Sequence, residues 1–211
     1  MKDLIDELTA AHRDVQRRED DGTDLFAVRL RRTYPAAVAD VWDAVTDPER
    51  LVRWFLPVTG DLRPGGSYQL EGNVGGDIVT CEPPRHLAVT WGAPQSVVTV
   101  RLTAEAAGRT VLELEHTVPA EFAGSGAGAL YVGPGWDVSF LALGTYLRGV
   151  VVADPAAWEN TLEGQHYSAG SIAAWSEVIG ASGTATADEI AAAADTARAQ
   201  FTPDLVATPG G

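Results

Sequence analysis

Four histidines and one cysteine are the side chains of this 211-residue chain best suited to acid–base, nucleophilic or metal chemistry. The histidines fall in separate predicted elements, and they are His12, His86, His116 and His166. No His-x-x-x-His or Cys-x-x-Cys spacing occurs, although zinc sites usually draw on such closely spaced ligands. The sequence therefore predicts neither a metal site nor a bound cofactor.

Nucleophilic catalysis has equally little support. The Gly-x-Ser-x-Gly turn that presents a catalytic serine is absent from the chain. Cys81 stands beside Glu82-Pro83-Pro84, which indicates the end of a strand and not an activated thiol. These observations favour a binding protein over an enzyme.

The histidine best placed to enter a site is His116. It belongs to a strand predicted over residues 109–118, whose apolar face carries Leu112, Leu114, His116 and Val118. We expect Glu113 and Glu115, on the opposite face, to be solvated charges. His116 is then either a core residue with one satisfied ring nitrogen, or a cavity residue. In the second case its buried, neutral imidazole could bind a ligand or act as a base.

Period-two alternation predicts further strands. The first begins at Leu25, with apolar side chains on one face and arginines on the other. Four more are expected over residues 67–72, 76–81, 87–91 and 96–102. Gly75-Gly76 and Ala107-Gly108 are turn signals. Because short turns join neighbouring strands, the sheet should be an antiparallel meander.

Helices are expected after the first strand and after the last. Two short helices meet at Asp47-Pro48, where the carboxylate can accept from free backbone N–H groups and the proline suits a first turn. A longer helix is expected over residues 134–152. Its large apolar side chains recur at i, i+4, i+7, i+11 and i+15, and they are Trp136, Phe140, Leu143, Leu147 and Val151.

Both ends of the chain are expected to add helices. Apolar residues at helical spacing predict one over residues 3–20, ended by Asp20-Asp21-Gly22. Thr186 and Glu189 match a capping box before another helix. The predicted organisation is an N-terminal amphipathic helix (1–23), the sheet with its long helix (24–152), a helical extension (153–201) and a disordered tail (202–211).

Several short segments occur in the order found in a known family. They are 32–36, 41–49, 54–55, 60–66, 81–87, 89–91, 115–117 and 133–136. Over roughly residues 24–151 the chain resembles the START-like (SRPBCC, helix-grip) superfamily, and within it the family homologous to activators of the ninety-kilodalton heat-shock protein ATPase. The resemblance implies an α+β fold in which a curved antiparallel sheet wraps around the long helix.

The resemblance also implies a cavity between the sheet and the long helix. Strand parity and helix periodicity direct a set of mostly aromatic and aliphatic side chains toward it. These candidates are Trp54, Phe55, Tyr68, Leu70, Trp91, Val98, Val100, His116, Trp136, Phe140 and Leu143. An apolar pocket with a few polar groups is the usual form of a small-molecule site. Each residue is equally well explained as core packing, so only their convergence on one cavity would carry meaning.

Glycine is concentrated in residues 121–135, which predicts a flexible loop. Tyr131 lies within this loop. We expect the loop to be either a lid over the cavity mouth, latched by Tyr131, or merely a mobile connection.

The chain carries 29 acidic residues against 15 basic ones, a formal charge of -14. Nucleic-acid binding depends on Lys and Arg, and an acidic surface repels anionic membranes. No apolar stretch reaches the roughly 20 residues of a spanning helix, and neither a leader sequence nor a second cysteine is found. We therefore expect a cytoplasmic protein that binds neither nucleic acid nor membranes.

Three functions stay open. The one we favour is binding of a hydrophobic or aromatic small molecule in the cavity. The second is a chaperone-associated interaction module, which the family name implies, with a chaperone or a second copy of the chain as partner. The third is a polyketide cyclase or hydrolase in which His116 is the base and Tyr68 a hydrogen-bond donor.

Overall fold

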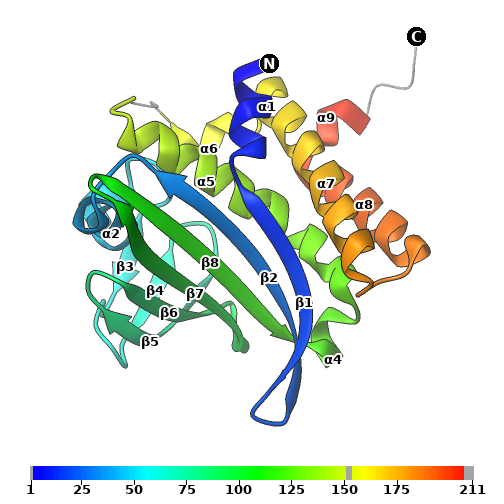
Figure 1. The fold of residues 1–211 in the computed structure, drawn as a ribbon, viewed down its shortest axis with the longest axis horizontal. Helices are drawn as coiled ribbons and strands as arrows, with labels where there is room; N and C mark the ends of the chain where they lie inside the picture. Colours follow the sequence, from blue (N-terminus) through cyan, green and yellow to red (C-terminus); the bar gives the residue numbers. More distant parts are fainter. Residues whose placement is uncertain (1, 151–153, 207–211) are drawn as a thin grey trace.

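A computed structural model describes residues 2–150 and 154–206 of the chain. Its centre is an antiparallel sheet with strand order β1-β2-β8-β7-β6-β5-β4-β3. The strands are β1 (His12–Asp20), β2 (Thr23–Tyr34), β3 (Val58–Gly60), β4 (Ser67–Leu70), β5 (Gly75–Glu82), β6 (His86–Trp91), β7 (Ala93–Ala106) and β8 (Arg109–Pro119). The sheet curves around helix α5 (Gly133–Leu147), which confirms the predicted helix-grip fold (Figure 1).

The other helices lie before, between and after these elements. They are α1 (Lys2–Thr9), α2 (Val38–Thr46), α3 (Pro48–Leu51), α4 (Ala120–Ala123), the 3₁₀ helix η1 (Gly126–Tyr131), α6 (Pro155–Trp158), α7 (Leu162–Ser182), α8 (Ala187–Phe201) and α9 (Pro203–Val206). Helices α2 and α3 meet at Asp47, whose side chain accepts from the backbone N–H of Glu49 at 2.9 Å. The predicted capping box of Thr186 and Glu189 is present at the start of α8.

The N-terminal segment differs from its prediction. Helix α1 ends at Thr9, and the rest of the expected helix is strand β1, which pairs with β2 along its whole length. Asp21 and Gly22 form the two-residue loop between them, with φ angles of 51° and 78°. Positive φ at both loop residues is the geometry of a type I′ hairpin turn, which Asp-Gly favours. The Asp-Gly pair was therefore a hairpin signal and not a helix end.

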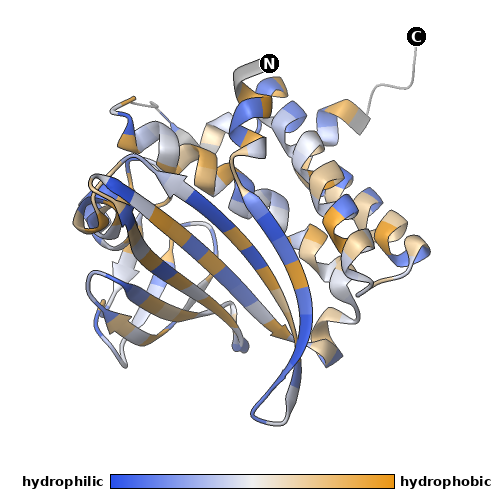
Figure 2. Ribbon diagram, viewed as in Figure 1, coloured by the Kyte–Doolittle hydropathy of each residue, from blue (hydrophilic) through white to orange (hydrophobic). Residues whose placement is uncertain are grey.

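Strand β1 lacks the alternation that revealed the other strands. Figure 2 shows it as almost continuously hydrophilic, whereas hydrophilic and hydrophobic residues alternate along β2, β7 and β8. Only Val15, which is buried, interrupts its polar residues. Beyond β1, the short strand β3 was not expected either, and Gly75 and Gly76 pair within β5 where a turn was predicted.

The glycine-rich segment 121–135 is mostly helical and partly buried. It forms α4, η1 and the first turn of α5, and Ala127, Ala129 and Leu130 of η1 are in the core. Element η1 packs against α7 and α8. The predicted flexible loop was wrong, because the C-terminal helices cover this segment and bury its small residues.

The C-terminal helices lie against α5 and the β1 edge of the sheet. Helix α7 packs on α5, β1, η1 and α1, and α8 packs on α7 and η1. In Figure 1 both helices stand on the side of the molecule opposite β3 to β6. Residues 203–206 of the predicted disordered tail form α9, and residues 207–211 lie outside the described part of the chain. Helix α5 ends at Leu147, and Val151 of its predicted stripe also lies outside.

Candidate functional site

Two apolar cavities lie on the concave side of the sheet. The first, of about 160 Å³, is lined by α2, α3 and strands β3 to β6, and its wall includes Tyr68, Leu70, Ile78 and Cys81. The second, of about 120 Å³, lies between strands β6 to β8 and α5. Its wall includes Val98, Val100, Trp136, Phe140 and Leu143. We call these two spaces the inner cavities.

The two inner cavities adjoin each other. Six residues line both, and they are Val45, Leu51, Phe55, Leu87, Val89 and Trp91. The rings of Phe55 and Trp91 therefore belong to the walls of both spaces. Each cavity alone is close to the size of the roughly 150 Å³ apolar cavity that holds one benzene in another protein.

A third and larger space, the outer cleft, has a volume of about 600 Å³. It is bounded by the β4–β5 turn, the first half of α5, the segment after α6 and the end of α8. It shares Trp54, Phe55, Trp91, Trp136 and Ser139 with the second inner cavity. The outer cleft therefore adjoins the second inner cavity.

Aromatic rings form the boundary between the cleft and the inner cavities. The ring centroids of Trp91 and Trp136 are 4.8 Å apart with an interplanar angle of 54°, and those of Trp54 and Phe55 are stacked at 5.4 Å. Such geometries lie within the range of favourable ring contacts. These aromatic rings, which come from strand β6, the segment after α3 and helix α5, thus lie close together.

Three polar groups on the inner walls are already bonded to the protein. The indole N–H of Trp54 donates to the carbonyl oxygen of Ala44, and the hydroxyl of Ser139 donates to the carbonyl oxygen of Gly135. The hydroxyl of Tyr68 donates to the Thr90 carbonyl at 2.8 Å. These groups have no hydrogen left to offer, so the inner cavities suit the apolar part of a ligand.

His116 is buried behind this wall and has both ring nitrogens bonded. The indole N–H of Trp136 donates to Nδ1 at 3.3 Å, and Nε2 lies 2.7 Å from the hydroxyl oxygen of Ser96. Because an indole only donates, Nδ1 must be an acceptor, which leaves the proton on Nε2 to be donated to Ser96. Burial lowers the pKa of His116 to about 4. Of the two alternatives for His116, the structure supports a neutral core residue and not a residue that lines the cavity.

The proposed pair of His116 and Tyr68 does not form a catalytic site. Tyr68 lines the first inner cavity, whereas His116 is absent from the wall residues of the inner cavities and the cleft. Burial raises the pKa of Tyr68 to about 12, so its proton stays on the oxygen that already donates to Thr90. Neither residue is free to move a substrate proton.

Apart from His116, each predicted wall residue lines at least one of these three spaces. Tyr68 and Leu70 line the first inner cavity, and Val98, Val100, Phe140 and Leu143 line the second. Tyr131 lines the outer cleft only, where it is half-exposed on η1. The aromatic residues Trp54, Phe55, Trp91 and Trp136 line more than one.

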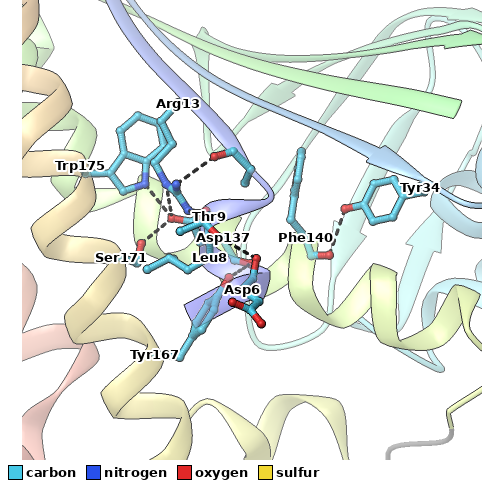
Figure 3. A network of polar contacts seen from close by, with 11 residues as sticks. Asp6, Leu8, Thr9, Arg13, Tyr34, Asp137, Phe140, Tyr167, Ser171 and Trp175 are labelled. Carbon is cyan, nitrogen blue, oxygen red and sulfur yellow. Dashed lines mark hydrogen bonds and ion pairs between the residues drawn. The ribbon is translucent and has the colours of Figure 1, made fainter. Parts of the chain in front are cut away.

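A buried polar cluster behind α5 was not expected from the sequence. Asp137 has no exposed surface, and its carboxylate accepts from Arg13 at 2.6 Å, from the hydroxyl of Ser171 at 2.5 Å and from the indole of Trp175 at 2.9 Å (Figure 3). The hydroxyl of Tyr167 donates to the backbone carbonyl oxygen of Asp137. The only sequence signal is that Asp137 is the single charged residue of an otherwise apolar helix.

Glu115 also differs from its prediction. It lies on the convex face of the sheet, yet it is buried, because the edge strand β1 brings Arg18 over it. Arg29 donates to the same carboxylate at 2.6 Å. Burial alone would raise the pKa of Glu115, but the hydrogen bonds from Arg29 and Arg18 outweigh it and the pKa lies below its usual value. Glu113 is half-buried, with Arg101 at 3.8 Å.

Two searches of the described residues, one for metal-binding clusters and one for membrane-spanning helices, found no candidate. None of their His, Cys, Asp and Glu side chains gather in threes in a way that would hold a metal ion. Within residues 2–150 and 154–206, no helix has the length and apolar character to cross a membrane.

Comparison with family models decides the relationship that the fold suggested. The model named Activator of Hsp90 ATPase homolog 1-like protein matches residues 35–148, which is more than half of the chain. The chain belongs to this family. The match covers the short helices, strands β3 to β8 and helix α5, which together enclose the inner cavities. Activator-like family membership thus confirms the resemblance seen in the sequence.

Among solved structures, CalU16 from Micromonospora echinospora is similar over more than the family segment. Its crystal structure is 38% identical to this activator-like chain, with a TM-score of 0.67, and the match covers 81% of this chain and 98% of CalU16. Its solution NMR structure is 36% identical with a TM-score of 0.69, covering 82% and 97%. The likeness to CalU16 therefore extends into the terminal elements.

A second similar structure is DynU16, a protein in the dynemicin biosynthetic locus. It is 27% identical with a TM-score of 0.51, and the match covers 62% of this chain and 48% of DynU16. A search of curated proteins found no match to the chain. These relatives share the activator-like fold.

Proposed function

We propose that this protein binds a hydrophobic, ring-containing small molecule between the sheet and α5. The observation that carries the proposal is the continuity of three spaces through shared aromatic residues, chiefly Phe55, Trp91 and Trp136. Ligand sites usually measure roughly 300–1,000 Å³ and are mostly apolar with few polar groups. The inner cavities alone are smaller than this range, whereas together with the cleft they fall within it.

The structural relatives support a small-molecule role. DynU16 belongs to a biosynthetic locus, and small molecules are what such loci make. The two acid–base candidates on which an enzyme would depend are both bonded within the fold, as described above for His116 and Tyr68. Binding without chemical conversion is therefore the function we favour.

The direct test uses a neutral two-ring probe, 2-naphthaleneethanol, titrated into the purified protein by calorimetry. We expect saturable one-to-one binding to the native chain. Replacing Val89, which lines both inner cavities, by phenylalanine fills that space and should weaken binding at least tenfold. The matched control is Val79→Phe on the outward face of β5, where the side chain is exposed and the probe should bind as before.

Two outcomes would overturn this proposal. One is equal affinity of the probe for the native protein and the Val89→Phe variant, with both proteins folded. The other is the absence of any binding, together with a clean apo mass in native mass spectrometry of protein isolated from its own host. A stoichiometric small molecule in that second measurement would name the ligand class.

The family description favours a second candidate, contact with a chaperone ATPase of the Hsp90 class. It predicts that adding the protein stimulates the ATPase rate of such a chaperone in a saturable way. An unchanged ATPase rate, together with probe binding, would leave the ligand-binding function.

A further inference from the structure

The outer cleft differs from the inner cavities in the chemistry of its wall. One side is aromatic and continuous with the inner cavities, and the other side is polar. The polar side chains come from three segments far apart in the sequence, and they are Glu71, Asn73, Glu159, Asn160 and Gln200. Tyr131 adds a hydroxyl group.

The charge of this wall has one sign. Glu71 and Glu159 contribute two carboxylates, and among the described residues that line the cleft there is no Lys, Arg or His. Both residues are exposed to solvent, and partial desolvation of the Glu159 carboxyl raises its pKa above the usual value. A carboxylate or phosphate on a ligand would meet two like charges here without a cationic partner, whereas an ammonium group or a hydroxyl group would meet suitable acceptors.

Segments after the family match supply three of the five polar side chains named above, Glu159, Asn160 and Gln200. Gln200 and Phe201 come from the end of α8, and Glu159 and Asn160 follow α6. The family match ends at residue 148. The C-terminal helices therefore turn the open side of the helix-grip cavity into a cleft with a polar face of its own.

We infer that the ligand is amphipathic. Its ring system occupies the inner cavities beside Trp91 and Trp136, and its polar part, bearing hydroxyl or amine groups and no anionic group, occupies the outer cleft against Glu71 and Glu159. This inference rests on the proposed function, because it describes which molecule the same site selects. The C-terminal helices are then specificity elements for that polar part.

The test compares three probes that share one ring system and differ in the terminal group. They are 2-(2-naphthyl)ethylammonium, 2-naphthaleneethanol and 2-naphthylacetate, titrated by calorimetry at low ionic strength, where charge interactions are least screened. We expect the ammonium probe to bind at least about tenfold more tightly than the carboxylate probe, with the alcohol between them or equal to the ammonium.

Substitutions distinguish the effect of the cleft carboxylates on probe selectivity from the effect of the net charge of the protein. The double variant Glu71→Gln/Glu159→Gln should lose most of the preference for ammonium over carboxylate and should bind the alcohol as before. The control Glu121→Gln/Glu177→Gln removes the same charge from exposed positions outside the cleft and should keep the preference. All four positions are exposed, so the variants are expected to fold.

The possible outcomes separate a failure of the amphipathic-ligand inference from a failure of the proposed binding function. Equal affinity for all three probes, or tightest binding of the carboxylate, would overturn the amphipathic ligand and leave the apolar site intact. A preference that survives in the cleft variant would also overturn it, because the selectivity would then come from net charge. Failure of all three probes to bind would instead count against the proposed function itself.

Discussion

The indole nitrogen of Trp136 donates a hydrogen bond to Nδ1 of His116 at 3.3 Å, so a buried histidine holds an aromatic ring of the cavity wall in place. Because an indole can only donate, this bond places the ring proton on Nε2, which donates to the hydroxyl of Ser96. A charged imidazole would carry a proton on Nδ1 and could no longer accept from Trp136. The neutral form of His116 is therefore part of the structure of the site.

Acidification should destabilise the protein through His116. Its pKa is about 4 in the folded state, against 6.5 when unperturbed, so the unfolded state binds the proton more readily. The associated stability is full above pH 6.5 and is lost as the pH falls from 6.5 toward 4, by about 3 kcal/mol in total. Urea unfolding at pH 7.0 and 4.5 measures it. The variant His116→Gln should show a smaller loss, and an equal loss in both proteins would contradict a lowered pKa of the buried His116.

Removal of the charge on Asp137 should be strongly destabilising. Arg13 is buried against it, with its side chain 6% exposed, and the variant Asp137→Asn leaves that guanidinium without a counter-charge. Breaking one partner of a buried ion pair costs about 3–5 kcal/mol, measured as the free energy of unfolding in urea. The control is Asp24→Asn, which breaks the exposed pair with Arg17 and should change the stability far less, because solvent screens an exposed ion pair. Similar effects of the two substitutions would contradict a buried ion pair between Asp137 and Arg13.

The contact between α5 and α7 can be tested with two alanine substitutions in the same helical turn. A Cβ atom at Gly133 would lie 2.5 Å from the ring of Trp175, which is completely buried. Gly133→Ala should therefore cost about 1–3 kcal/mol of stability. At Gly135 the nearest atom is 3.8 Å away, so Gly135→Ala should be neutral or stabilising by up to about 1 kcal/mol. Thermal denaturation would compare them, and equal effects would show that α7 does not pack there.

Cys81 offers a chemical probe of the first inner cavity. It is the only cysteine, it lines that cavity, and burial raises the pKa of its thiol. Because the thiolate is the reactive form, alkylation by iodoacetamide at neutral pH should be slower than that of free cysteine. Saturating 2-naphthaleneethanol should slow it further, and this protection should disappear in the Val89→Phe variant. A rate equal to that of free cysteine and insensitive to the probe would rule out a shielded thiol.

Much of the architecture was predictable from local patterns. Alternation located β2 and β4 to β8 to within a few residues, because one face of each strand is buried against the core. The helix starts at Asp47 and Thr186 were equally legible, since capping depends on residues three or fewer positions apart. The convergence of the aromatic residues followed from the family resemblance together with strand parity.

Other features depend on contacts between residues far apart in the chain. Strand β1 is nearly all polar, and it is stabilised by pairs such as Arg13 with Asp137, 124 positions away, and Arg18 with Glu115, 97 positions away. The glycine-rich segment packs against α7 and α8, which lie later in the chain. The outer cleft joins the β4–β5 turn to the ends of α6 and α8. Periodicity and capping are local and can be read from sequence, whereas the pairing of buried charges and the shape of a cleft exist only once distant segments pack together.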